Sequence, residues 1–112
     1  MPLQELPGPT IAAGAVLSDG IDTSAGRLVR INTPPLWTPA HLTFQISTDG
    51  GGYNDLYKGA YEVIIPKCGP GRAYFVNPDD WPSLVWLKIR SGTRRAPVAQ
   101  EAARAFSLVI ET

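Results

Sequence analysis

The stretch Trp37-Thr-Pro-Ala-His-Leu-Thr-Phe-Gln-Ile-Ser-Thr-Asp-Gly-Gly-Gly-Tyr53 decides the fold class of this chain. From Leu42 to Ser47, the apolar side chains of Leu, Phe and Ile alternate with those of Thr, Gln and Ser. Because alternate side chains of a strand point to opposite faces, the segment predicts a strand with one face on an apolar core and the other toward water or a partner. The following Asp49-Gly-Gly-Gly52 predicts a hairpin turn, since glycines supply the positive φ angles that tight turns need.

The composition of the whole chain also favours many short strands. Its 112 residues suit one domain, which would bury roughly two-thirds of the surface that the unfolded chain exposes. The 11 glycines and 11 prolines are spread along the chain as turn signals rather than gathered in one tract. The 10 basic and 10 acidic side chains cancel, so the net charge favours neither nucleic acid nor a basic partner. A net charge near zero suits a protein that works in an assembly.

Signals for secretion and for membrane insertion are missing from the sequence. The N-terminus lacks the basic region and the apolar region of a signal peptide. No apolar run approaches the roughly 20 residues of a membrane span. We therefore expect no membrane partner.

Further strands are predicted on both sides of the central one, wherever alternating or β-branched residues are bounded by turn signals. They cover residues 11–17, 26–31, 53–57, 61–65, 72–76, 86–91 and 106–111, with 21–25 as a connector or edge segment. In this set Val29, Leu87 and Ile89 are expected to face inward and Arg90 outward. About seven to eight short strands, with turn signals about every 8–12 residues, predict an all-β fold: an antiparallel β-sandwich or jelly roll.

Residues 1–10 contain three prolines and one glycine, so they predict an extended N-terminal arm rather than a helix. The sandwich domain is then expected to cover residues 11–112. Two interpretations of the arm stay open. It is either a frayed terminus or a segment that lies on a neighbouring subunit with Leu3 and Leu6 as anchors.

Residues 97–104 fit two structures. Strong helix formers follow Pro97, which stands at a suitable first helical position, so about one or two helical turns fit the segment. A strand that approaches a hairpin and pairs with residues 86–91 fits it as well, and this is the structure that we expect.

Residue types that carry catalysis are scarce. A nucleophilic site would need His41, the only histidine, beside the single cysteine, Cys68, and nothing in the sequence positions them together. The lone cysteine excludes an intramolecular disulfide and a multi-cysteine zinc site, and it predicts a buried or bystander thiol. Asp79 and Asp80 are adjacent and suit a turn better than a pair of catalytic carboxylates. We therefore expect no catalytic residue, no cofactor and no metal ligand.

The glycine loop between Asp49 and Asp55 leaves a second interpretation open. Its carboxylate and carbonyl oxygens could wrap calcium, but the spacing differs from that of the helical calcium loop, so a plain hairpin is expected. The string is also similar to the Asp-box hairpin of sialidases, although its aromatic residue follows the glycines too closely. It is not a phosphate loop, because no lysine followed by Ser or Thr ends it.

Two kinds of side chain could form a binding surface. The basic ones are Lys88, Arg90, Arg94 and Arg95. They fit a solvated strand face and loop, or contact with nucleic acid or an acidic surface; without a matching aromatic pattern, nucleic acid is not expected. The aromatic ones near loops are Trp37, Tyr53, Tyr57, Trp81 and Trp86. They could pack in the core, stack on sugars or anchor a protein interface, and Trp81 is the best candidate for an exposed anchor.

Three motifs carry a resemblance to a known group of proteins. They are Trp37-x-x-Ala40-x-Leu42-Thr-Phe-Gln45-x-Ser47-x-Asp49-Gly50, Leu87-Lys88-x-Arg90-Ser-Gly-Thr93 and Pro97-Val98-x-Gln100. Through these motifs, and over roughly residues 11–111, the chain resembles small β-sandwich proteins in the structural gene modules of tailed bacteriophages and prophages. The resemblance implies a virion protein without enzyme activity and without a cofactor.

These observations lead us to expect a non-enzymatic virion structural protein that decorates or stabilises the capsid or forms the base of a head fibre. It would be a homo-oligomer in the particle, assembled in the host cytoplasm, whose arm and one sheet edge grip neighbouring virion subunits. The contact residues expected are Leu3, Leu6, Trp81, Arg94 and Arg95. A carbohydrate-binding adhesion module with a glycan partner, a tail accessory protein and a small hydrolase are the alternatives.

Overall fold

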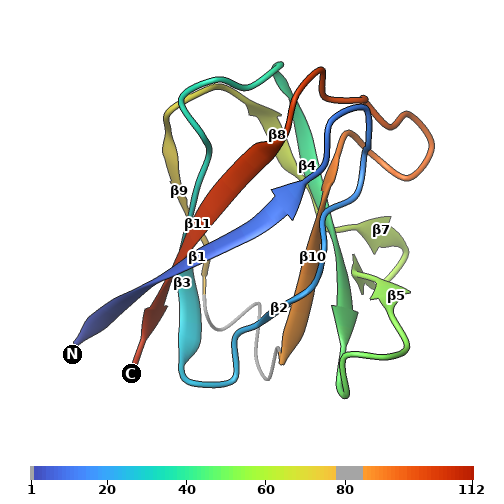
Figure 1. Cartoon of the computed structure of the whole chain (residues 1–112). Helices are drawn as coiled ribbons and strands as arrows, with labels where there is room; N and C mark the ends of the chain where they lie inside the picture. Colours follow the sequence, from blue (N-terminus) through green and yellow to red (C-terminus); the bar gives the residue numbers. More distant parts are fainter. Residues whose placement is uncertain (1, 78–84) are drawn as a thin grey trace.

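The computed structural model describes residues 2–77 and 85–112, and in this part of the chain all regular structure is β. Antiparallel strands form two sheets that face each other across an apolar core (Figure 1). Sheet A has the order β1 (Leu3–Ile11), β11 (Arg104–Glu111), β3 (Arg27–Asn32) and β9 (Ala73–Phe75). Sheet B has the order β2 (Ile21–Asp22), β10 (Trp86–Ser91), β4 (Ala40–Ser47) and β5 (Asn54–Asp55), and β8 (Ile65–Cys68) also pairs with β4. No described helix is long and apolar enough to cross a membrane.

The strand order is that of a jelly roll. If β1, β2, β3, β4, β8, β9, β10 and β11 are counted from one to eight, sheet A reads 1-8-3-6 and sheet B reads 2-7-4-5. This alternation of the chain between two sheets forms two Greek keys. The prediction of an all-β antiparallel sandwich is confirmed. The other described strands are the two-residue β5, β6 (Tyr57–Lys58) and β7 (Tyr61–Glu62), which all lie in the connection from β4 to β8.

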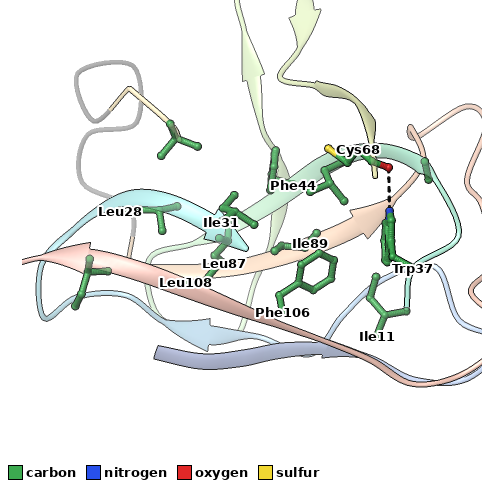
Figure 2. Packing of buried hydrophobic residues seen from close by; sticks show 14 residues of the cluster. Ile11, Leu28, Ile31, Trp37, Phe44, Cys68, Leu87, Ile89, Phe106 and Leu108 are labelled. Carbon is green, nitrogen blue, oxygen red and sulfur yellow. Dashed lines mark hydrogen bonds between the residues drawn. The ribbon is translucent and has the colours of Figure 1, made fainter. Parts of the chain in front are cut away.

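The apolar faces of the two sheets meet as the alternation predicts (Figure 2). Leu42 and Phe44 of β4 pack with Leu87 and Ile89 of β10, and all four are fully buried. From sheet A, the residues that belong to this buried core are Ile11, Leu28, Ile31, Phe106, Leu108 and Ile110. Fully burying one such large side chain contributes about 1.5–3 kcal/mol to the free energy of unfolding, so this layer supplies most of the stability.

The expectation that Val29 faces inward is wrong. In the ladder between β3 and β11, Val109 pairs with Arg30 and Ile110 pairs with Leu28, so Val29 has no partner in the register. This β-bulge shifts the alternation by one residue and turns Leu28 toward the core in place of Val29.

The N-terminal segment is extended, as predicted, but it is a strand of the sandwich rather than a separate arm. β1 runs through residues 3–11 and pairs with β11, so the boundary expected between residues 10 and 11 falls inside one strand. The first strand predicted at 11–17 is wrong, because Ile11 ends β1 and the chain then turns through Gly14 at φ 77°. The prolines of β1 are tolerated because the strand lies at a sheet edge.

Two further expectations about strands are corrected. Residues 97–104 form no helix and no full strand before β11 begins at Arg104; the expected pairing is limited to a bridge from Pro97 to Gly92 and a hydrogen bond from the amide of Val98 to the carbonyl oxygen of Ser91 at 2.9 Å. The strand predicted at 61–65 is divided into β7 and β8, and β8 continues past Pro66, because it pairs with β4 through an irregular register. The turn predicted at Asp79 and Asp80, and Trp81 after it, lie outside the described residues.

Candidate partner-binding surface

The outer face of sheet B carries a buried cluster of charged side chains. Arg90 points outward from β10, as predicted, yet it is only 8% exposed. Its Nη2 donates to Oδ1 of Asp55 at 2.6 Å, and its Nη1 donates to Oε2 of Glu62 at 3.2 Å. Asp55 belongs to β5 and Glu62 to β7, so these ion pairs fasten the insertion between β4 and β8 onto the sheet.

The electrostatics of the cluster favour an ionised Asp55. Burial alone raises the pKa of this carboxyl, but hydrogen bonds from Arg90 and Gln45 and the charges of Arg90 and Arg94 outweigh burial, so the pKa lies below its usual value. The guanidinium of Arg94 contributes from 3.5 Å, between its Nε and Oδ2 of Asp55. Asp55 is therefore a charged anchor of the insertion rather than a proton donor near neutral pH.

The expectation that the hydroxyl face of β4 meets water or a partner is wrong at its ends. Thr43 is fully buried, and its hydroxyl donates to the carbonyl oxygen of Gly92 at 2.8 Å. Gly92 must approach this closely: its φ is 89°, and a Cβ there would lie 2.5 Å from the carbonyl oxygen of Ala96. Ser47 is also buried, and its hydroxyl accepts a hydrogen bond from the amide of Gly50 in the turn after β4.

Above this cluster, four exposed side chains surround a shallow hollow, and we call them the Tyr–Arg surface: Tyr57, Tyr61, Arg94 and Arg95. Tyr61 is 80% exposed at the start of β7, and Tyr57 is 43% exposed at the start of β6. The hollow between them and the arginines has a volume of about 510 Å³. Arg94 and Arg95, two of the predicted contact residues, both line this hollow.

The Tyr–Arg surface is held in place from below. The backbone amide of Arg94 donates to the Glu62 carboxylate at 3.3 Å, so the arginine loop and the hairpin share one anchor. A hydrogen bond with Tyr57, followed by the charges of Tyr57 and Asp55, raises the pKa of the Arg94 guanidinium further. The three guanidinium groups of Arg90, Arg94 and Arg95 outnumber the carboxylates of Asp55 and Glu62, so this group of side chains carries one excess positive charge.

Two other predicted contact residues, Leu3 and Leu6, lie on β1 of sheet A, away from this surface. Leu3 is 57% exposed on β1, at the opposite sheet, while Leu6 packs partly against the apolar core. Leu3 and Leu6 face opposite sides of β1, because residues of opposite parity in a strand do so, and Leu3 is the more exposed of the two predicted anchors. Trp81 lies outside the described residues.

His41 and Cys68 lie near each other on paired strands but serve the fold. Nδ1 of His41 accepts a hydrogen bond from the backbone amide of Lys67 at 3.0 Å. Cys68 is buried, its thiol lies 3.4 Å from the carbonyl oxygen of Ile65, and burial raises its pKa to about 11. A thiol with this pKa is a poor nucleophile near neutral pH.

This burial predicts slow alkylation of Cys68. With a pKa of about 11, roughly a thousandth of the thiol is ionised at about pH 8, and the side chain is inaccessible. We expect iodoacetamide to modify the native protein at least about 100-fold more slowly than the urea-unfolded protein. Mass spectrometry against time measures both rates, and equal rates would contradict the burial.

The glycine loop is a hairpin turn that uses its own carboxylate. Oδ1 of Asp49 accepts hydrogen bonds from the amides of Gly51 at 2.8 Å and Gly52 at 3.3 Å, which lower its pKa. β4 and β5 then pair antiparallel, as predicted for a hairpin. In the described ranges, no group of three or more His, Cys, Asp and Glu side chains is placed to hold a metal ion.

The remaining aromatic candidates divide between core and surface. Trp37 is buried and packs edge-on against Phe106, with 5.2 Å between the ring centroids. Its Nε1 donates a hydrogen bond to the carbonyl oxygen of Cys68 (Figure 2). Tyr53 lies under the ammonium group of Lys88, at 4.4 Å from the ring centroid. Only Tyr57 of these candidates contributes to the Tyr–Arg surface.

For this surface, sequence reasoning missed Tyr61 and Glu62. A signal for Tyr61 was present, since the Lys58-Gly59 turn sits between two tyrosines, but nothing local connects Glu62 with Arg90.

A comparison of the chain with protein-family models, curated proteins and solved structures finds no match in any of the three.

Proposed function

We propose that this protein is a non-enzymatic structural protein of a bacteriophage virion, which decorates or stabilises the capsid or forms the base of a head fibre. The observation that carries the proposal is the Tyr–Arg surface. Exposed tyrosine and arginine side chains are the residue types that contribute most to binding energy at protein interfaces. Buried ion pairs fix the hairpin that presents them, so little conformational entropy is lost when a partner binds.

The charge of the surface indicates its partner. One excess positive charge and two guanidinium forks suit a virion protein that presents carboxylates, because arginine binds carboxylates through paired hydrogen bonds. Many copies on one particle would convert a modest affinity into stable attachment. The resemblance to phage structural proteins and the zero net charge support the same location, the assembled virion.

The test is binding to particles that lack this protein. We expect Tyr61→Ser combined with Arg95→Ser to weaken attachment by about 100-fold or more, because each replaced side chain is an anchor of the interface. The matched control is Phe75→Ser combined with Arg72→Ser, which removes an exposed aromatic and an arginine beside β9 of sheet A. Co-sedimentation with particles measures attachment, and equal losses in both double variants would contradict the proposed surface.

A second function is favoured by the hollow itself. Tyr57 and Tyr61 flank it and could stack on sugar rings, while Arg94 and Arg95 could bind acidic groups of a glycan. This would make the protein an adhesion module on the phage head, or an accessory protein of the tail. A glycan array with the assembled protein, and with Tyr61→Ser as control, tests it, and the absence of any Tyr61-dependent glycan signal would refute it.

A further inference from the structure

Two arginine side chains are buried in the part of the chain that the structure describes, and they differ in their surroundings. Arg90 is 8% exposed and pairs with two carboxylates. Arg104 is 9% exposed, and among the described residues it forms no ion pair. A buried cation is costly unless an opposite charge replaces the water that it loses. Arg104 therefore carries a charge that its own fold does not neutralise.

The fold turns the Arg104 side chain inward at one end of the sandwich. Arg104 begins β11 and has the same parity as Phe106, so its side chain lies on the core face of sheet A. Its Nε donates to Oε1 of Gln100 at 3.1 Å, which fixes the direction of the guanidinium group. Both Nη atoms lack a hydrogen-bond partner among the described residues, yet they are not sealed in, since Nε of Arg30 is the only side-chain atom there that is both buried and unpartnered. Support of Gln100 therefore uses only Nε, and the fork of Nη donors opens toward solvent.

Arg104 lines a hollow with a volume of about 460 Å³, which we call the Arg104 hollow. Its apolar walls are formed by Pro35, Leu36, Trp37 and Pro70. Leu36 is 74% exposed, so a large apolar side chain of this wall is left in contact with water. Hollows of about 300–1,000 Å³ that combine apolar walls with a few fixed polar groups are typical of small-ligand sites. None of the lining residues belongs to the Tyr–Arg surface.

We infer that the Arg104 hollow binds a carboxylate that is joined to an apolar group. The two Nη atoms of a guanidinium match the two oxygen atoms of a carboxylate, and paired hydrogen bonds of this kind are short and strong. The ligand would supply the opposite charge that Arg104 lacks. Its apolar group would pack on Leu36 and the two prolines and remove their surface from water.

The other charged residue of the hollow narrows the choice of anion. Glu101 lines the same hollow, is exposed, and forms no ion pair with Arg104. One arginine and one carboxylate leave no excess positive charge, so the hollow has little to offer a doubly charged phosphate or a nucleic acid backbone. A single carboxylate needs only the one arginine, and its apolar group gains contacts that a phosphate cannot make.

The inference does not depend on attachment through the Tyr–Arg surface, which other residues form. The end of a polypeptide chain with an apolar last residue has the required chemistry, and so has a free apolar acid. Binding is measured in solution without particles, so its failure and the failure of particle attachment are separate results.

A titration followed by the backbone amide resonance of Ala102, a lining residue, tests the site. The probes are N-acetyl-leucine as a polypeptide end, hexanoate as a free apolar acid, and N-acetyl-leucine amide, which lacks the carboxylate. We expect a Kd of about 1 mM or tighter for the better acid, and binding of the amide to be at least about tenfold weaker. Tighter binding of N-acetyl-leucine than of hexanoate indicates a polypeptide end, and the reverse order indicates a free acid. Equal binding of the amide, or no saturable shift with either acid below about 50 mM, would overturn the inference.

Variants of the walls and of the charges provide the second test. Arg104→Lys keeps the charge but loses the fork, so we expect about tenfold weaker binding of the better acid. Leu36→Ser leaves the contact with Gln100 in place and should weaken binding about fivefold, which keeps the test valid even if Arg104→Lys fails to fold. Leu3→Ser, which replaces an exposed leucine on β1, is the matched control and should leave the Kd unchanged.

Glu101→Gln removes the repelling carboxylate and should strengthen binding about threefold, a gain that damage to the fold does not produce. Equal effects of Leu36→Ser and Leu3→Ser would overturn the site. Binding that is seen only after Glu101→Gln would also overturn the inference, because Glu101 would then be the natural counter-charge of Arg104.

Discussion

Replacing Gln100 with alanine is expected to lower the free energy of unfolding by about 3–5 kcal/mol, because several buried partners lose their hydrogen bonds at once. Gln100 is fully buried. Its Oε1 accepts from the amide of Thr38 at 3.0 Å and from Nε of Arg104 at 3.1 Å. Its Nε2 donates to the carbonyl oxygen of Thr38 at 3.0 Å and to the hydroxyl of Ser91 at 2.9 Å.

Gln45→Ala is the matched control for this substitution. Gln45 is half-buried and makes one long bond, from Nε2 to Oδ1 of Asp55 at 3.3 Å. We expect its loss to cost about 1 kcal/mol or less. Urea denaturation followed by tryptophan fluorescence gives both values, and similar losses for the two variants would show that the Gln100 network contributes little.

Replacing Arg90 with methionine is expected to cost about 3 kcal/mol, since Asp55 and Glu62 would remain largely buried without their cation. The charge cluster also fixes the β6–β7 hairpin, so the same variant should weaken particle attachment through the Tyr–Arg surface. Lys88→Met is the control on the same strand and face. It removes only the contact over the Tyr53 ring and should cost about 1 kcal/mol or less.

The cost of Arg90→Met should depend on pH in a defined direction. The pKa of Asp55 is lowered in the folded protein, so its stabilising contribution is complete above its unfolded value of about 3.9 and is lost as the pH falls through the folded value. The difference in unfolding free energy between wild type and variant should therefore be constant near neutral pH and shrink as the pH falls below about 3.9. A difference that stays constant as the pH falls below about 3.9 would exclude Asp55 from the cluster.

Removal of all three charges offers a further check on the same cluster. Arg90→Met combined with Asp55→Asn and Glu62→Gln leaves no buried charge unpaired, so it should recover part of the stability lost by Arg90→Met alone. No recovery would show that the cost arises from packing of the arginine stem rather than from the two carboxylates.

The sandwich itself could be predicted because its core strands carry regular patterns. Leu42 and Phe44, and then Leu87 and Ile89, alternate with polar residues over enough positions to determine both conformation and buried face. The bulge at Val29 interrupts this alternation, and no single residue type in the sequence indicates a bulge there. The strand β1 was not predicted because its prolines argue against a strand, and a sheet tolerates them there only because β1 lies at an edge.

The candidate site was predictable only in part, since its residues meet through long-range contacts. Arg94 and Arg95 are evident from sequence as an exposed basic loop. Glu62, which joins that loop to the hairpin, bonds with a residue 28 positions away in the sequence. Gln100 lies in a segment whose local preferences suggested a strand or a helix, yet its bonds to Thr38 reach 62 positions.

The pairing of β1 with β11 determines when this protein can fold during its synthesis. A ribosome releases the chain from its N-terminus, and β11 lies between β1 and β3 in sheet A (Figure 1). The centre of that sheet therefore stays empty until residues 104–111 have left the exit tunnel. Until then the apolar inner sides of β1 and β3 have no neighbour between them. Folding should follow translation of the last strand as one slow, concerted event, and the interval before it is when aggregation competes most strongly.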